Sequence, residues 1–322
     1  MQPSGVRRAR LANPLPMTLR VYRKLSSAMV PLAPALINRR LKLGKEDPLR
    51  VSERRGMSAD VRPAGPLVWI HGASVGEVLA SAALVEQLRA LNLRILLTSG
   101  TVTSAAVVAK RFPPDVIHQY VPYDSPRYVA RFLDHWRPSL ALFIESDLWP
   151  NLILSSAARR VPMVLINGRM SPRSFPRWRR VSGTISALLG RFELCLAQSE
   201  TDAERFSALG SPNVVTTGNL KLDVPAPPAD QAKLERLMSM TRGRPVVIAA
   251  STHSGEDEML AEAHKTLAGF FPGLLTVIVP RPYPRSPRRD RGAAARSRSE
   301  GSERIRPASC APPPASRPRR NG

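Results

Sequence analysis

The sequence has 322 residues, 43% of them hydrophobic and 5% aromatic, so it is long enough for one large or two ordinary domains with cores of their own. Its formal net charge of +23 favours an anionic partner, such as a phosphorylated lipid, a nucleotide sugar or a nucleic acid, without choosing among them. The two cysteines, Cys195 and Cys310, have neither metal-ligand spacing nor the pattern of a disulfide framework, which fits a reducing compartment.

Residues 1–66 form a basic N-terminal segment. Its longest apolar run, LSSAMVPLAPALI (25–37), is too short to span a bilayer, is interrupted by Pro31 and Pro34, and has basic residues on both sides. No small-residue cleavage site follows it, which disfavours a secretory signal. We expect a short helix that lies on an anionic membrane face; the alternative is a soluble helix packed on its own domain.

From Leu67 to Leu222, short apolar runs alternate with helical patterns. The runs predicted as buried strands are 67–71, 94–98, 116–121, 140–144, 163–167, 194–197 and 214–218. The predicted helices between them include one that begins near Asp124-Ser125-Pro126 and one over 174–190. Because the strands are apolar throughout rather than alternating, we predict a doubly wound α/β domain, with a parallel sheet covered on both faces.

A second α/β pattern follows a proline-rich linker at 223–230 (DVPAPPAD). A helix over about 230–240, a strand at 245–250, a helix over about 256–269 and a strand at 274–279 predict part of a second Rossmann-like domain over 231–281. The composition then changes abruptly. Residues 281–322 hold 12 Arg, three acidic residues and eight of the 32 prolines, so we predict a disordered basic tail over 282–322.

Ligands of open parallel sheets bind beyond the carboxyl ends of the strands, and two motifs follow strands of the first domain. In HGASVGE (71–77), Gly72, Ser74 and Gly76 allow a close backbone approach to a ligand at a helix start. Glu77 would lie in the first helical turn, where it either acts on a ligand or only complements the helix dipole.

In ESDLWPN (145–151), Glu145 and Asp147 stand at a strand end beside Trp149, which is either a sugar platform or part of the core. Two further motifs lie near the linker. GNLKLD (218–223) places Lys221 where it either faces a cleft or is an ordinary surface lysine.

STHSGE (251–256) puts Ser251, Thr252 and His253 before a helix, which suits a phosphate, although a Ser/Thr N-cap explains the same residues without a ligand. Two α/β domains without a metal-binding motif fit a metal-independent glycosyltransferase of the two-Rossmann type.

The motifs HGASVGE, ESDLWPN, NGRMSPRS, GNLKLD and STHSGEDE, followed by VPR at 279–281, resemble those of the bacterial Kdo transferases in order and spacing. These enzymes attach 3-deoxy-D-manno-octulosonic acid (Kdo) to lipid A. The resemblance covers about residues 18–281. It implies a GT-B fold of two Rossmann-like domains and an inverting transfer from CMP-Kdo to a lipid A precursor (lipid IVA), with no cofactor or metal.

The resemblance also implies roles for individual residues. Glu77 matches the general base, and Glu145 and Lys221 match positions assigned to transition-state stabilisation. Gly72, Ser74 and Gly76 would bind the acceptor. The residues expected to bind the donor are Ser251, Thr252, His253, Pro280 and Arg281. The implied place is the cytoplasmic face of the inner membrane, with the N-terminal segment on the anionic lipid surface and no nucleic acid as partner.

The sequence departs from the family pattern in two places. Asp147 stands where the family usually has Glu, which is a conservative change. After Arg281 the family's PRHPER and its later glycine-rich and acidic donor motifs are missing. We therefore expect a C-terminally truncated second domain and a poor or inactive catalyst. The alternatives are a transferase of the same fold that uses another nucleotide sugar, and a non-catalytic basic protein that binds lipid or RNA.

Overall fold

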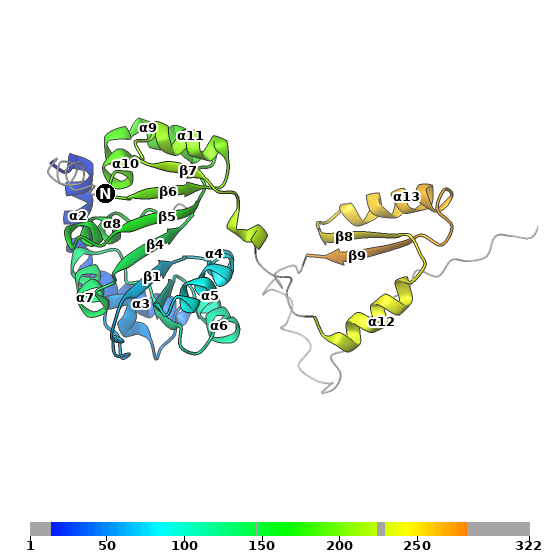
Figure 1. The fold of residues 1–322 in the computed structure, drawn as a ribbon, viewed down its shortest axis with the longest axis horizontal. Coiled ribbons are helices and arrows are strands. Elements are labelled where there is room, and N and C mark those ends of the chain that lie inside the picture. Colours follow the sequence, from blue (N-terminus) through cyan, green and yellow to red (C-terminus); the bar gives the residue numbers. More distant parts are fainter. Residues whose placement is uncertain (1–13, 146, 224–228, 282–322) are drawn as a thin grey trace, which may run out of the picture. The chain divides into compact units, whose positions relative to one another are not determined.

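A computed structural model describes residues 14–145, 147–223 and 229–281. The chain divides between Pro227 and Pro228 into two compact units (Figure 1). This division falls within the predicted linker at 223–230, most of which lies outside the described residues. The predicted tail at 282–322 also lies outside them.

The first unit is built on a parallel sheet of seven strands in the order β3-β2-β1-β4-β5-β6-β7. The strands are β1 (Leu67–His71), β2 (Arg94–Ser99), β3 (Ile117–Tyr120), β4 (Leu140–Ile144), β5 (Met163–Gly168), β6 (Leu194–Ala197) and β7 (Val214–Thr216). Each lies within one residue or two of a predicted apolar run, so the predicted α/β fold is confirmed.

Helices cover both faces of this sheet (Figure 1). They are α4 (Val75–Ala80), α5 (Ala82–Ala90), α6 (Val102–Arg111), α7 (Pro126–Trp136), α8 (Pro150–Ala158), α9 (Ser174–Arg180), α10 (Ser182–Leu189) and α11 (Glu200–Ala208). Successive strand residues point to opposite faces. Trp69 and Phe143 therefore join a core with α7, α8, α10 and α11, whereas Ile70 and Leu142 join a second core with α4, α5 and α6.

The helix predicted over 174–190 is wrong in one respect, because two helices occupy this range. They are separated at Val181, whose φ of −122° and ψ of 45° are not helical. Ile185, Leu188 and Leu189 of α10 are buried in the core, whereas no residue of the arginine-rich α9 is buried. A break lets the apolar helix follow the sheet while the basic helix remains at the surface.

The N-terminal segment packs on the first unit and also presents an apolar surface. It contains α2 (Met17–Ala28), η1 (Val30–Leu32), α3 (Ala33–Lys42) and η2 (Val51–Arg55). Leu19 is 1% exposed within the core beside α7 and α8, and Ile37 is also 1% exposed. The residues that face outward form an apolar stripe: Met17, Val21, Leu25, Met29, Leu32 and Leu36. In the described part of the chain, no helix combines the length and hydrophobicity needed to cross a bilayer.

Buried charges fasten the residues after α3 to the sheet. The Glu46 carboxylate pairs with Arg54 at 2.8 Å and with Arg40 at 2.6 Å. Arg54 also donates to the backbone oxygens of Gly100 and Val121, which lie beyond the carboxyl ends of β2 and β3. A buried pair of this kind is costly to break, because the remaining charge would be left without its partner.

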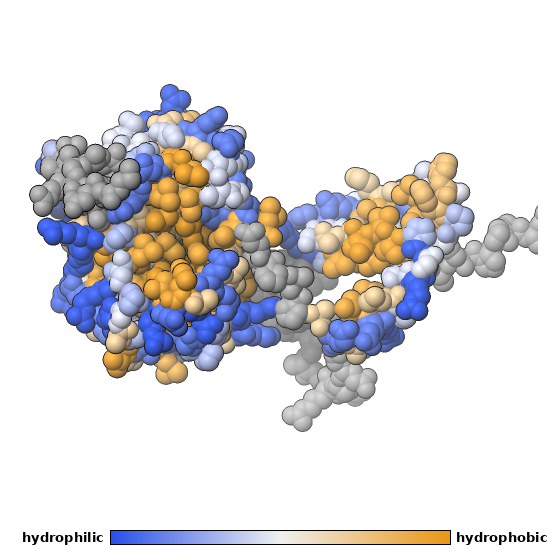
Figure 2. Space-filling view, viewed as in Figure 1, coloured by the Kyte–Doolittle hydropathy of each residue, from blue (hydrophilic) through white to orange (hydrophobic). Residues whose placement is uncertain are grey.

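The second unit contains α12 (Gln231–Thr241), β8 (Val246–Thr252), α13 (Glu256–Ala268) and β9 (Leu275–Pro280), in agreement with the predicted elements. The two strands pair in parallel. Figure 2 shows hydrophobic residues gathered on the surface over these strands. Ile248 is 67% exposed and Val279 is 49% exposed, so the described part of this unit leaves apolar strand residues in contact with solvent.

Candidate active site

The candidate site lies at the carboxyl ends of β1 and β4, which are neighbours in the sheet. The strand order reverses between these two strands, because the chain moves outward from β1 to β2 and β3 and then returns to β4 on the other side. Such a switch point opens a crevice between the loops that leave the sheet in opposite directions, and ligands bind there in doubly wound folds.

Glu77 lies in the first turn of α4. Its carboxylate accepts hydrogen bonds from the backbone N–H of Ala73 at 2.7 Å and from the hydroxyl of Ser74 at 2.8 Å. Ser74 is the N-cap and accepts from the Glu77 N–H in return. Burial raises the pKa of Glu77 above its usual range, and the nearby carboxylates of Glu145 and Asp147 add to this effect, although the two hydrogen bonds oppose it. Glu77 therefore caps the helix, and its carboxylate is also more basic than an ordinary one.

Two glycines allow the tight packing of this turn. A Cβ on Gly72 would lie 3.1 Å from the Cβ of Glu77, and one on Gly100 would lie 2.9 Å from the Ala73 carbonyl oxygen. These contacts within the protein account for both glycines. Gly76 differs, because a Cβ there would meet only Lys221 Cε and Ser74 Oγ, each at 4.0 Å. Gly76 therefore lies on the side of α4 that faces Lys221.

Glu145 and Lys221 come from distant parts of the sheet and form an ion pair. The Lys221 Nζ lies 2.6 Å from Glu145 Oε1, with the side chains 43% and 20% exposed. Glu145 directly follows β4 and has a φ of +61°, which is rare for a residue other than glycine. Lys221 lies in the short helix η3 (Leu220–Asp223) after β7. It is therefore not an isolated surface lysine.

Asparagines hold η3 against the sheet. The Asn167 side chain at the end of β5 accepts from the Leu220 N–H at 2.9 Å, and the Asn219 side chain accepts from the Lys221 N–H at 3.0 Å. Neither residue was predicted from the sequence to belong to the site. Asn167 stands at the start of NGRMSPRS and Asn219 within GNLKLD, and an asparagine at the end of an apolar strand or just after it was the available signal.

Asp147 and Trp149 complete this edge of the sheet. Trp149 is 43% exposed, which excludes the alternative that it belongs to the core. A cavity of about 170 Å³ adjoins both residues and is also lined by Ala73, Arg40 and Arg54, among others. The two arginines were not predicted as site residues, because nothing in the local sequence distinguishes them from other basic residues of the N-terminal segment.

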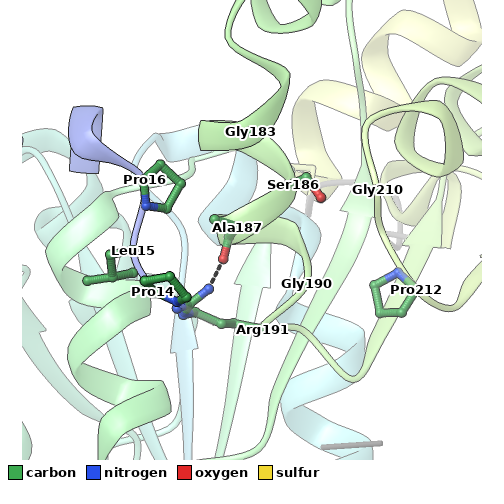
Figure 3. Close-up of a pocket in the computed structure, with 10 residues that line it drawn as sticks. All are labelled: Pro14, Leu15, Pro16, Gly183, Ser186, Ala187, Gly190, Arg191, Gly210 and Pro212. Carbon is green, nitrogen blue, oxygen red and sulfur yellow. Dashed lines mark hydrogen bonds between the residues drawn. The ribbon is translucent and has the colours of Figure 1, made fainter. Parts of the chain in front are cut away.

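The pocket shown in Figure 3 lies elsewhere. Its volume is about 360 Å³, and its lining includes Gly190, Arg191, Gly210 and Pro212, which precede β6 and β7. It therefore lies at the amino ends of the strands, and none of the predicted site residues lines it. The Arg191 guanidinium donates to the Ala187 carbonyl oxygen there.

In the second unit, the predicted donor-binding residues gather where β8 and β9 end. Thr252 is the register partner of Pro280, and its carbonyl oxygen accepts from the Arg281 N–H at 3.1 Å. The His253 N–H is bound to the Glu256 carboxylate at 2.7 Å. The Thr252 hydroxyl is buried and has no hydrogen-bond partner within the described residues. Ser251 has a φ of +62°.

The alternative that a Ser or Thr is the N-cap of α13 is wrong, since the N-cap is Gly255 and no side chain caps the helix there. Across residues 14–145, 147–223 and 229–281, no cluster of three or more His, Cys, Asp or Glu side chains could hold a metal ion.

A family model described as "3-Deoxy-D-manno-octulosonic-acid transferase (kdotransferase)" matches residues 49–224. The 3-deoxy-D-manno-octulosonic acid transferase of Rickettsia bellii is 34% identical over 265 residues, which cover 82% of this chain and 63% of the relative. A probable mitochondrial 3-deoxy-D-manno-octulosonic acid transferase of Arabidopsis thaliana is 34% identical over 271 residues, which cover 81% of this chain and 61% of the relative. This chain thus spans somewhat over half the length of these curated relatives.

Among solved structures, a UDP-GlcNAc 2-epimerase from Neisseria meningitidis has a TM-score of 0.48 and 16% sequence identity, covering 69% of this chain and 66% of that one. The family model and both curated relatives are described as 3-deoxy-D-manno-octulosonic acid transferases, which are glycosyltransferases. The chain belongs to the 3-deoxy-D-manno-octulosonic acid transferase family.

Proposed function

We propose that the protein serves the transfer of Kdo from CMP-Kdo to a lipid A precursor, lipid IVA, in lipopolysaccharide biosynthesis, with inversion at the anomeric carbon. Membership of the family supports the reaction class. The observation that carries the proposal is the meeting of Glu77, Glu145 and Lys221 at the switch point of the first unit. These three residues come from α4, the end of β4 and η3, so only the tertiary fold assembles them.

In the proposed reaction, Glu77 removes the proton of an acceptor sugar hydroxyl while the oxygen attacks the anomeric carbon of Kdo. A raised pKa suits this task, because a more basic carboxylate binds the proton more strongly. To do so, Glu77 exchanges its bond from the Ser74 hydroxyl for one from the acceptor. The bond from the anomeric carbon to the phosphate oxygen breaks, and its electron pair leaves with CMP.

Lys221 is the proposed source of positive charge for this step. A cation is most effective where negative charge develops during the reaction. The Glu145 carboxylate contacts the Lys221 ammonium at 2.6 Å and so holds it at this edge of the sheet. Gly76 leaves space beside the lysine stem. In the second unit, Ser251, Thr252, His253, Pro280 and Arg281 are the proposed donor-binding residues, supported by their grouping where β8 and β9 end.

We propose that the apolar stripe of α2, η1 and α3 meets an anionic membrane surface, on the cytoplasmic face of the inner membrane. The stripe lies on the outward side of a segment whose other side is buried. The exposed basic residues Lys24, Arg39 and Lys42 accompany it, and lysine and arginine near anionic lipids contribute about 1 kcal/mol each. Such a surface would bring the site to a lipid acceptor.

Acceptor binding and transfer should be measured separately. Lipid IVA binding to the purified chain, by calorimetry in detergent, tests the first unit, and product formation from CMP-Kdo, by mass spectrometry, tests the reaction. We expect lipid IVA to bind to the first unit. Transfer should be slow, because the strands that carry the proposed donor-binding residues leave apolar side chains exposed, and such a surface destabilises the second unit. The variant Glu77→Gln should bind lipid IVA normally and lose transfer by about 10²–10⁴-fold.

The control is Glu86→Gln, since Glu86 is exposed on α5 and pairs there with Arg89 at 2.9 Å. Full transfer by the Glu77 variant would mean that Glu77 is only a capping acid. Absence of lipid IVA binding would contradict the proposed acceptor.

A further inference from the structure

His71 is a buried histidine at the end of β1 that the proposed reaction does not use. Its side chain is fully buried. Its Nδ1 lies 2.9 Å from the Thr98 hydroxyl oxygen, and its Nε2 lies 3.3 Å from Asp147 Oδ2. The ring is packed edge-on against Phe143, with the ring centroids 5.8 Å apart. His71 therefore connects β2, through Thr98, to the residues that follow β4.

The neighbouring groups determine which ring nitrogen of His71 carries a hydrogen. The Trp69 indole N–H, which can only donate, donates to the Thr98 hydroxyl oxygen at 2.9 Å. The hydroxyl hydrogen of Thr98 is then directed at His71 Nδ1, its remaining polar contact within the described residues. A neutral ring that accepts at Nδ1 carries its hydrogen on Nε2, and a charged ring carries one there as well. In both cases an Nε2–H group faces Asp147.

His71 Nε2 and Asp147 Oδ2 face each other at 3.3 Å. Both atoms are buried, and neither makes a hydrogen bond of good geometry within the described residues, so the 3.3 Å approach is the polar contact that each has there. At 3.3 Å the pair is longer than an ideal charge-assisted hydrogen bond, yet burial makes its loss costly. Burial alone would raise the pKa of Asp147, but the His71 ring beside the carboxylate lowers it below its usual value.

Asp147 lies between two residues of the candidate site. Glu145, two positions earlier, is held in a left-handed conformation that is strained outside glycine. The Trp149 N–H, two positions later, is bound to the Asp147 carbonyl oxygen at 3.1 Å. A backbone turned in this way persists only when surrounding contacts hold it. The hydrogen bond from the Glu145 N–H to the Ile166 carbonyl oxygen, at 2.9 Å, is one such contact. The contact of the His71 ring with the Asp147 carboxylate is another.

We propose that His71 is a positioning residue, which acts through Asp147 to fix the backbone that carries Glu145 and Trp149. Its consequence for catalysis rests on the function proposed above, whereas its effect on the position of Trp149 does not. A histidine with only a packing role would stabilise the fold without determining where Trp149 and Glu145 lie.

The first test is the state of the ring. Nitrogen-15 NMR of the five labelled histidines, with His71 assigned from its variants, reports which nitrogens carry hydrogen. We expect a hydrogen on Nε2, and a changed Nε2 signal in Asp147→Asn. A hydrogen found on Nδ1 alone would overturn the proposal, because Nε2 would then have none to donate to Asp147.

The second test compares His71→Gln with His71→Met. Glutamine can accept from Thr98 and donate to Asp147, whereas methionine fills a similar volume without either bond. Acrylamide quenching of the Trp149 fluorescence, obtained by difference from Trp149→Phe, reports the position of Trp149. We expect at least a twofold change in the quenching constant for the methionine variant, and a value near that of the native protein for glutamine.

Asp147→Asn should resemble His71→Met, and the double variant should add little, because the two residues act through one contact. Equal quenching in the methionine and native proteins, measured well below their unfolding midpoints, would overturn the proposal even if stability falls. Where the native chain transfers Kdo, kcat should fall at least tenfold in the methionine variant and recover with glutamine. If the native chain does not transfer Kdo, NMR and quenching still decide the role of His71.

Discussion

Leu19 and Leu25 lie six residues apart on α2, and replacing each with alanine should have opposite effects. Leu19 is 1% exposed in the main core, whereas Leu25 is 61% exposed on the apolar stripe. Leu19→Ala leaves a cavity and should lower the free energy of unfolding by about 2–4 kcal/mol, the range for buried leucines. Leu25→Ala removes no core contact and should change it by less than about 0.5 kcal/mol.

Membrane binding should show the reverse order. Each buried methylene contributes about 0.8 kcal/mol, so the change from leucine to alanine at position 25 removes roughly 2 kcal/mol if Leu25 enters the lipid interface. At 1.4 kcal/mol for each tenfold change, this weakens vesicle binding by about tenfold or more. Leu19→Ala should bind vesicles normally while it remains folded, because Leu19 faces the core.

Urea unfolding measures the first quantity, and flotation with vesicles rich in anionic phospholipid measures the second. Flotation of the native chain should decrease as salt rises, because part of the attraction comes from basic side chains. Leu91→Ala is the control, since Leu91 is 69% exposed at the end of α5, away from the stripe. Equal vesicle binding by the native chain and Leu25→Ala would refute the membrane assignment. An unchanged stability of Leu19→Ala would refute the packing of α2.

Three further outcomes are expected. Glu77 should make the free energy of unfolding rise as pH falls, because its pKa is raised in the folded state, which therefore binds the proton more strongly than the unfolded state does. Urea unfolding at several pH values should show that this pH dependence is missing from Glu77→Gln. Lys221→Met should reduce the rate of transfer by about 10²-fold or more, but the free energy of unfolding by less than about 1 kcal/mol, since its ion pair is partly exposed. A loss of transfer that is matched by a large loss of folding stability would indicate a structural role. Ile248→Ser should lower the binding of a hydrophobic dye to the chain, and unchanged dye fluorescence would mean that β8 is covered in solution.

Much of the fold could be predicted because its signals are local. A buried parallel strand requires a short, continuous apolar run, so LVWIH and LALFI identify β1 and β4 without knowledge of their neighbours. The start of α7 was equally readable, because Ser125 is the N-cap and Pro126 occupies the first turn. The break at Val181 was not readable, since the side chains on both sides are compatible with one helix and only packing on the sheet separates them.

The candidate site was predictable in its residues but not in its contacts. Motifs at strand ends pointed to Glu77, Glu145 and Lys221, because parallel strands end at one edge of a sheet. The strand order decided which motifs meet: β1 and β4 became neighbours, and η3 returned from β7 to bring Lys221 within 2.6 Å of Glu145. The pairing of His71 with Asp147 depends on the same neighbourhood and on the left-handed backbone at Glu145. Apolar periodicity reports which residues face a core, whereas contacts between residues 76 positions apart depend on how the strands and helices pack.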